Sequence, residues 1–97
     1  MVDNDYKYID LTEKIIGCAF KVHSKLGTGF LEKIYENALM IELNKAGLSA
    51  QQQYPIKVYY DEVIIGDHVA DMVVEDKVVI ELKAVNQLVR AHEVQLV

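Results

Sequence analysis

Several residue types that stabilise or target small proteins are scarce in this 97-residue chain. Cys18 is the sole cysteine, which excludes a disulfide framework and a cysteine-rich zinc site and favours a reducing compartment. The single proline excludes a proline-rich linker. No apolar run approaches the roughly 18 residues of a membrane span, and the polar N-terminus carries no signal-peptide core. These absences predict a soluble cytoplasmic protein.

Positive charge is also scarce. Lys and Arg total 10 against 15 Asp and Glu, a formal net charge of -5. This balance argues against broad electrostatic attraction to nucleic acid, although a bound metal ion would supply positive charge locally. The length suits one domain. We expect a flexible arm over residues 1–9 and a single domain over residues 10–97.

Apolar residues at three- and four-residue intervals predict two helices near the N-terminus. The first runs from about Asp10 to Leu26, where Gly27 is placed to end it in the left-handed conformation. The second runs from about Phe30 to Ala46 and is followed by another glycine. Because the link between them is short, we expect both to pack on one side of a sheet.

Alternating apolar residues then predict an antiparallel meander of three strands. They span residues 54–60, a run over residues 63–74 that Gly66 and Asp67 interrupt, and residues 77–83. A short final helix is expected to begin around Val89 to His92. The order α-α-β-β-β-α gives an α+β, sandwich-like fold class.

The most informative residues are charges within the last two apolar strands. Asp71 lies in one strand, and Glu81 and Lys83 lie in the next. If Val74 pairs with Val78 across a three-residue hairpin loop, Asp71 lies opposite Glu81, and both share a face with Lys83. The opposite face is then uniformly apolar: Met72, Val74, Val78, Ile80 and Leu82.

Two carboxylates with a neighbouring lysine suit a site for a hard divalent cation. Asp71, Glu81 and the backbone carbonyl of Leu82 would supply oxygen ligands for Mg²⁺. Lys83 would hold or activate an attacking water and offset charge on a phosphoryl oxygen. The alternative is a solvated face whose cross-strand charges contribute a few tenths of a kcal/mol, roughly.

A second group of residues lies around the start of the second helix. Glu32 falls in the first helical turn, where a negative charge interacts favourably with the helix dipole. Tyr35 shares its side of the helix, so that both could face one cleft, or Tyr35 could be a core residue with its hydroxyl at the edge. His68, just before the strand of Asp71, is a minor candidate for contact with a phosphate.

Gly29, Glu32 and Tyr35 match the G-x-x-E-x-x-Y pattern of a family of small bacterial and archaeal proteins, and the chain resembles that family from Leu11 to Val97. The GxxExxY family is assigned to the PD-(D/E)xK nuclease superfamily, whose Asp…Glu-x-Lys core matches Asp71 and Glu81-Leu82-Lys83. The resemblance implies a restriction-endonuclease-like core with a Mg²⁺ site, in which Mn²⁺ would substitute.

The same resemblance assigns roles to two helical residues. It implies that Glu32 is an acid near the metal or its waters. It also implies that Gln95, in the expected last helix, lies near the catalytic lysine or a phosphate. Lys83, Glu32 and Gln95 are thus the candidate catalytic residues, and Asp71, Glu81 and Leu82 the candidate metal ligands.

The chain departs from the family at its C-terminal end, where members continue into a further strand beside the Glu-x-Lys strand. We therefore expect a C-terminally truncated domain with an exposed sheet edge, which favours pairing with a second copy as a homodimer. The leading hypothesis is a Mg²⁺-dependent nuclease acting on DNA. The alternatives are a nuclease-like domain that no longer cuts and serves as a binding or assembly module, and a plain interaction domain.

Overall fold

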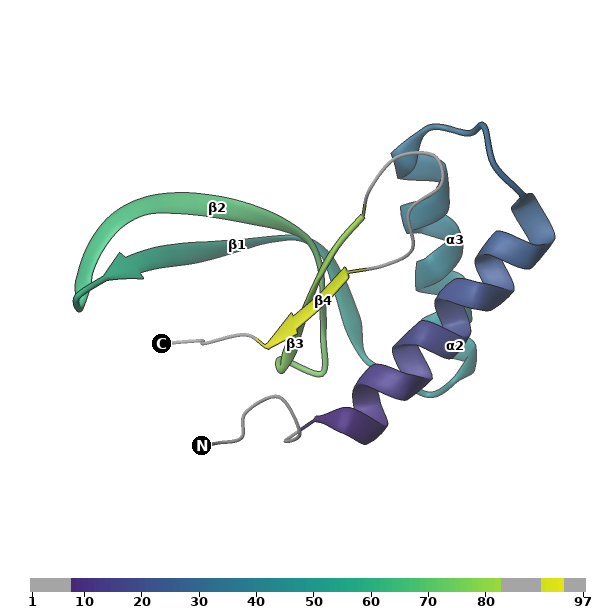
Figure 1. Ribbon diagram of the computed structural model, residues 1–97, viewed down its shortest axis with the longest axis horizontal. Coiled ribbons are helices and arrows are strands. Elements are labelled where there is room, and N and C mark those ends of the chain that lie inside the picture. The colour runs from purple at the N-terminus through teal and green to yellow at the C-terminus, as the bar shows by residue number, and fades with distance from the viewer. Residues whose placement is uncertain (1–7, 83–89, 94–97) are drawn as a thin grey trace.

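The structure is a computed structural model, and it describes residues 8–82 and 90–93. It has α+β architecture, with two helices beside an antiparallel sheet of strand order β1-β2-β3-β4 (Figure 1). The elements are α2 (Ile9–Leu26), α3 (Glu32–Lys45), β1 (Ala50–Tyr60), β2 (Val63–Val74), β3 (Val78–Glu81) and β4 (Arg90–Glu93). Within the described ranges, neither helix has the length and apolar character that crossing a membrane requires.

Both helices cover the same face of the sheet, as the short link between them predicted (Figure 1). α2 ends at Gly27, so the predicted stop at this glycine is confirmed; its φ is positive, at 72°, but its ψ of -156° differs from that of the left-handed helical conformation. The helix-facing core is formed by residues of both helices and of strands β2 and β3: Ile15, Cys18, Ala19, Val22, Leu39, Leu43, Met72, Val74, Val78 and Ile80. The helices and the β2–β3 hairpin therefore form the packed body of the protein.

Cys18 is a core residue of this body, on the apolar face of α2. Its Sγ lies 3.6 Å from the backbone oxygen of Glu42, and burial raises the pKa of the thiol. The side chain of Glu42 is almost fully buried and accepts a hydrogen bond from Lys25 at 3.0 Å, which lowers the pKa of the carboxyl group. The two helices are thus joined by apolar packing and by one ion pair.

The predicted register of the β2–β3 hairpin is confirmed. Val74 pairs with Val78 and Met72 with Ile80, across the loop over residues 75–77. The apolar face expected from this register lies against the helices, with Leu82 packed at its edge. Asp71 and Glu81 are therefore brought to neighbouring positions on adjacent strands.

The β1–β2 hairpin is longer than the rest of the sheet. Its inner part pairs with β3 or lies under the helices, whereas its outer part extends away from them as a two-stranded ribbon (Figure 1). The pairing shifts between Val58 and Tyr59, which leaves Ile65 as the extra residue of a bulge. β2 thus continues through Gly66 and Asp67, where the sequence predicted an interruption.

The expected helix around Val89 to His92 is wrong for the residues that the structure describes. Arg90–Glu93 forms β4, which pairs antiparallel with β3 from Val78 to Glu81. A helix of one or two turns is marginal in water, whereas pairing with β3 satisfies the backbone groups of a buried strand. The edge of β3 that was expected to be exposed is therefore covered by β4.

Candidate functional site

Asp71 lies where backbone pairing on both sides of β2 is irregular. On the β3 side the ladder pairs Met72 with Ile80, and beyond this pair the Asp71 carboxylate itself accepts the Leu82 N–H, with 2.7 Å between Oδ2 and N. On the β1 side the residue opposite Asp71 is Gln53, which has φ 52° and is skipped by the pairing. The side chain of Asp71 thus extends the β2–β3 contact to the Glu-x-Lys segment.

Glu81 lies on β3, and its carboxylate is oriented by His68 of β2. The Nε2 of His68 lies 3.0 Å from Oε2 of Glu81, and both side chains are partly exposed. The sequence suggested His68 only as a contact for phosphate. The structure instead places its ring against one of the two predicted metal-binding carboxylates.

The remaining predicted site residues are not brought together in the part of the chain that is described. Lys83 and Gln95 lie outside the described residues. Glu32 occupies the first turn of α3 and is exposed, in the position favoured by the helix dipole. Among the described residues, Glu32 forms no hydrogen bond with Asp71 or Glu81. Its proposed participation therefore rests on the sequence pattern alone.

Tyr35 closes the loop between the two helices. Its hydroxyl donates to the carbonyl oxygen of Gly27 at 2.7 Å and accepts the N–H of Phe30 at 3.2 Å. The ring also packs against the helix-facing core and meets Phe30 edge to face. Of the two interpretations of Tyr35, the structure favours the core residue with its hydroxyl at the edge.

The sequence analysis missed Glu36, a buried carboxylate on α3. It accepts hydrogen bonds from Lys33 at 3.2 Å, from Gln52 at 2.6 Å and from Gln53 at 3.2 and 3.3 Å. The signal was present, because Glu36 falls on the helical stripe that continues with Leu39 and Leu43. A charged residue within such a stripe indicates a buried polar contact, here between α3 and the strand next to Asp71.

The donor set around Asp71 fits a hard divalent cation. Each of the Asp71 and Glu81 carboxylates uses one oxygen for a described hydrogen bond, and each keeps its second oxygen for another partner. With the carbonyl of Leu82, these are the oxygen ligands that Mg²⁺ prefers, and water and substrate commonly complete its coordination. Within the described ranges, no group of three or more His, Cys, Asp or Glu side chains is placed to hold a metal by itself.

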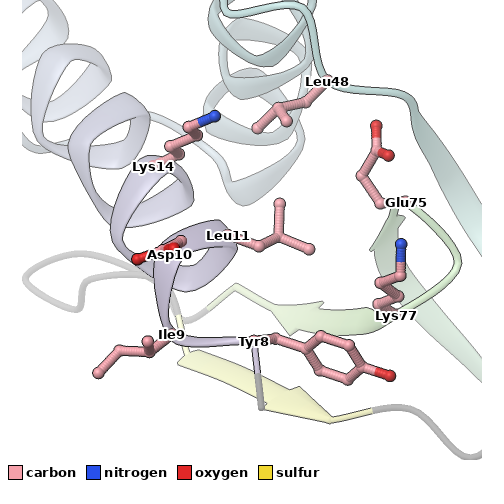
Figure 2. A pocket seen from close by; sticks show the side chains of 8 residues that line it. All are labelled: Tyr8, Ile9, Asp10, Leu11, Lys14, Leu48, Glu75 and Lys77. Carbon is pink, nitrogen blue, oxygen red and sulfur yellow. The ribbon is translucent and has the colours of Figure 1, made fainter. Parts of the chain in front are cut away.

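A pocket of about 450 Å³ lies elsewhere, between the start of α2 and the β2–β3 turn (Figure 2). Its lining mixes apolar and charged side chains: Tyr8, Ile9, Asp10, Leu11, Lys14, Leu48, Glu75 and Lys77. Glu75 is partly engaged, because its Oε2 accepts the N–H of Ser49 at 2.6 Å. None of the predicted site residues lines this pocket, which is therefore separate from the site at Asp71.

Comparison with known proteins gives one match. A model of the PD-(D/E)XK nuclease superfamily matches residues 9–97, a range that includes both helices and the β2–β3 hairpin with Asp71 and Glu81. No curated protein and no solved structure matches significantly. The matched range covers most of the chain. The chain therefore belongs to the PD-(D/E)XK nuclease superfamily.

Proposed function

We propose that the protein hydrolyses phosphodiester bonds of nucleic acid, with DNA as the substrate, and depends on Mg²⁺. The observation that carries this proposal is the hydrogen bond from the Leu82 N–H to the Asp71 carboxylate. It joins the Asp of the superfamily pattern to the segment that carries Glu81. The pattern of Gly29, Glu32 and Tyr35 further supports placing the chain in the GxxExxY family.

The proposed roles follow from the chemistry of the side chains. Asp71, Glu81 and the Leu82 carbonyl would hold the metal, which when bound supplies positive charge to a phosphate and lowers the pKa of its waters. Lys83 would hold the attacking water and offset negative charge on the phosphoryl group. Glu32 would assist from α3, and Gln95 would contact the lysine or a phosphate. His68 would help to orient the Glu81 carboxylate, which lies 3.0 Å from its Nε2.

The alternative is a nuclease-like domain that binds or assembles without cutting. The acidic net charge of -5 favours it, because little general attraction to a nucleic-acid backbone remains without a bound cation. Catalytic turnover distinguishes the two hypotheses. Both predict a folded hairpin, and only the first predicts cleavage that depends on Lys83.

The decisive experiment is calorimetric titration of Mn²⁺ into the protein, because Mn²⁺ shares the preference of Mg²⁺ for oxygen ligands. Binding to the wild type that is lost in Asp71→Asn would support the site. Asp67→Asn is the matched control, since Asp67 lies on the same strand but is exposed and paired with Lys57 at 2.7 Å. Equal binding by wild type and Asp71→Asn would refute the assignment of Asp71.

Cleavage assays on DNA and RNA of single- and double-stranded form then test the reaction. We expect Lys83→Ala to abolish cleavage and to leave Mn²⁺ binding largely intact. Unchanged cleavage would remove Lys83 from the mechanism. Mn²⁺ binding without cleavage of any substrate would favour the binding or assembly module.

We also propose self-association through an edge of the sheet, now at β1 instead of β3. β4 pairs with β3, whereas β1 is the first strand of the sheet order and its outer edge is open among the described residues. Such an edge offers unpaired backbone groups to a second copy. Light scattering across a range of protein concentrations tests this proposal, and a constant monomer mass would refute it.

A further inference from the structure

The contact between Glu36 of α3 and two consecutive glutamines of β1 has a geometry that regular strands do not allow. Side chains of neighbouring strand residues point to opposite faces of a sheet. Here the amide nitrogens of both Gln52 and Gln53 reach the carboxylate of Glu36, at 2.6 Å and at 3.2 and 3.3 Å. This is possible because Gln53 has φ 52°, in the left-handed region that non-glycine residues seldom adopt.

The same position is the one at which β1 faces Asp71. The ladder pairs Gln52 with Met72 and Tyr54 with Ala70, so Gln53 lies across from Asp71 without a backbone pair. Alternation in β2 is broken there as well: Met72 belongs to the helix-facing core and Ala70 to a second cluster with Val73 and Val79. Strict alternation would place Ala70 and Met72 on one face. The kink therefore spans both strands at the candidate site.

Glu36 has the properties of an anchor for this kink. Its side chain is only 5% exposed and receives hydrogen bonds from one ammonium group and two amides. A buried carboxylate requires such partners, and removing it would leave the two amides without their shared acceptor. Left to itself, Gln53 would return to the extended conformation that its strand neighbours adopt.

We infer that Glu36 is a positioning residue for the candidate metal site. Its carboxylate holds Gln53 in the left-handed conformation, and the resulting kink sets the position of Asp71 relative to Glu81. The link to metal binding rests on the proposed function, whereas the link from Glu36 to the kink does not. Glu36 itself touches neither metal nor substrate and acts through Gln53.

The first test reads the kink without any metal. Backbone chemical shifts and the three-bond HN–Hα coupling of Gln53 report its φ angle, and the amide signal of Asp71 reports the opposite strand. In Glu36→Ala we expect Gln53 to move to extended values and the Asp71 signal to shift. Glu42→Ala is the matched control, because Glu42 is a buried acid of the same helix that pairs with Lys25. Unchanged Gln53 signals in Glu36→Ala would overturn the inference.

The second test measures Mn²⁺ affinity. Residues that orient metal ligands typically change affinity by about 10- to 100-fold, and we expect a loss in this range for Glu36→Ala. Adding Gln53→Gly should restore most of it, because glycine adopts positive φ without an anchor. If Glu36→Ala does not fold, Gln53→Val tests the same kink, since a branched side chain opposes positive φ while Glu36 remains.

The outcomes separate the inference from the proposed function. If wild type binds Mn²⁺ and folded Glu36→Ala or Gln53→Val binds it with equal affinity, the positioning role is overturned and the proposed function stands. No Mn²⁺ binding by wild type counts against the proposed function, and the NMR comparison still decides whether Glu36 sets the kink. Failure of Gln53→Gly to rescue affinity in the Glu36→Ala background, with the amide signal of Asp71 restored, also overturns the positioning role.

Discussion

The two ends of β2 have similar composition and opposite environments. At the inner end Val74 is 0% exposed beneath the helices, and at the outer end Val63 is 60% exposed in the ribbon. Ile64 and Ile65 are exposed beside it, at 53% and 62%. Both ends pair with β1, so backbone hydrogen bonding does not distinguish them. The difference lies in the second layer, which the helices provide at one end only (Figure 1).

The difference shows that the same residue types can form a strand without being buried. β-branched residues favour an extended backbone at both ends. Apolar surface contributes to stability only where another element removes it from water. The ribbon therefore leaves apolar surface exposed, while the packed body holds the candidate site. Four comparisons between the two regions test this view.

The largest expected effect comes from truncating a valine in the packed body. Val74→Ala removes two fully buried methyl groups and should lower the free energy of unfolding by roughly 2 kcal/mol. Val63→Ala is the same substitution at the other end of β2 and should change it by less than about 0.5 kcal/mol. Urea unfolding measures both. Equal losses of unfolding free energy in the two variants would mean that the ribbon is covered in solution.

A tyrosine hydroxyl provides the next comparison. Tyr35→Phe removes the bonds to Gly27 and Phe30 and should cost about 1 kcal/mol of unfolding free energy. Tyr60→Phe, in the ribbon, should have no measurable effect because Tyr60 is 68% exposed. Thermal unfolding by circular dichroism measures the pair. A Tyr35→Phe variant as stable as wild type would show that the loop does not depend on this hydroxyl.

We expect the contributions of two ion pairs to stability to depend on pH in different ways. The hydrogen bond from Lys25 lowers the pKa of Glu42, so this pair stabilises the fold above the ordinary Glu pKa of 4.5 and loses its effect as pH falls through the lowered value. Asp67 raises the pKa of Lys57 above its ordinary 10.5, so on the alkaline side that pair loses its effect only above pH 10.5. We expect Lys25→Met to destabilise the protein at pH 7 and to converge with wild type in strongly acidic solution.

Lys57→Met is the control in the ribbon. Its difference from wild type in unfolding free energy should be small and constant between about pH 5 and 9, because both partners are exposed and the raised pKa of Lys57 keeps its ammonium group charged there. Urea midpoints measured from pH 2 to 9 compare the two variants. A Lys25→Met difference that persists unchanged at pH 2 would contradict the assignment to Glu42.

The smallest effect is expected from shortening the ribbon. Val58 pairs with Gly66, so residues 59–65 can be replaced by an Asn-Gly turn that closes a two-residue hairpin. The melting temperature should stay within roughly 3 °C of wild type, because the removed residues pack on no second layer. Calorimetry measures the change. A large drop in the melting temperature would show that the ribbon stabilises the body. Unchanged self-association of the shortened protein would place any contact between copies outside the ribbon.

Much of the fold and part of the candidate site follow from the local pattern of apolar and charged residues in the sequence. The spacing of apolar residues predicted both helices, and the apolar face predicted the β2–β3 register that places Asp71 near Glu81. The range that the superfamily model matches includes this hairpin. The partners of Glu36 and the contact of His68 were not predicted, because the identity of a hydrogen-bond partner in a distant element leaves no periodic trace. The strand at Arg90–Glu93 was mistaken for a helix, since so short a segment carries little propensity of its own.

The sequence by itself determined both helices, the three strands of the meander and which face of the β2–β3 hairpin is apolar, because these properties depend on neighbours within a few residues. Only the tertiary structure decided which apolar residues are buried, which strand covers β3, and where the β1–β2 pairing kinks at Gln53. Each of these depends on a partner far along the chain. The kink opposite Asp71 exists because a carboxylate on α3 is placed to receive two glutamine amides from β1.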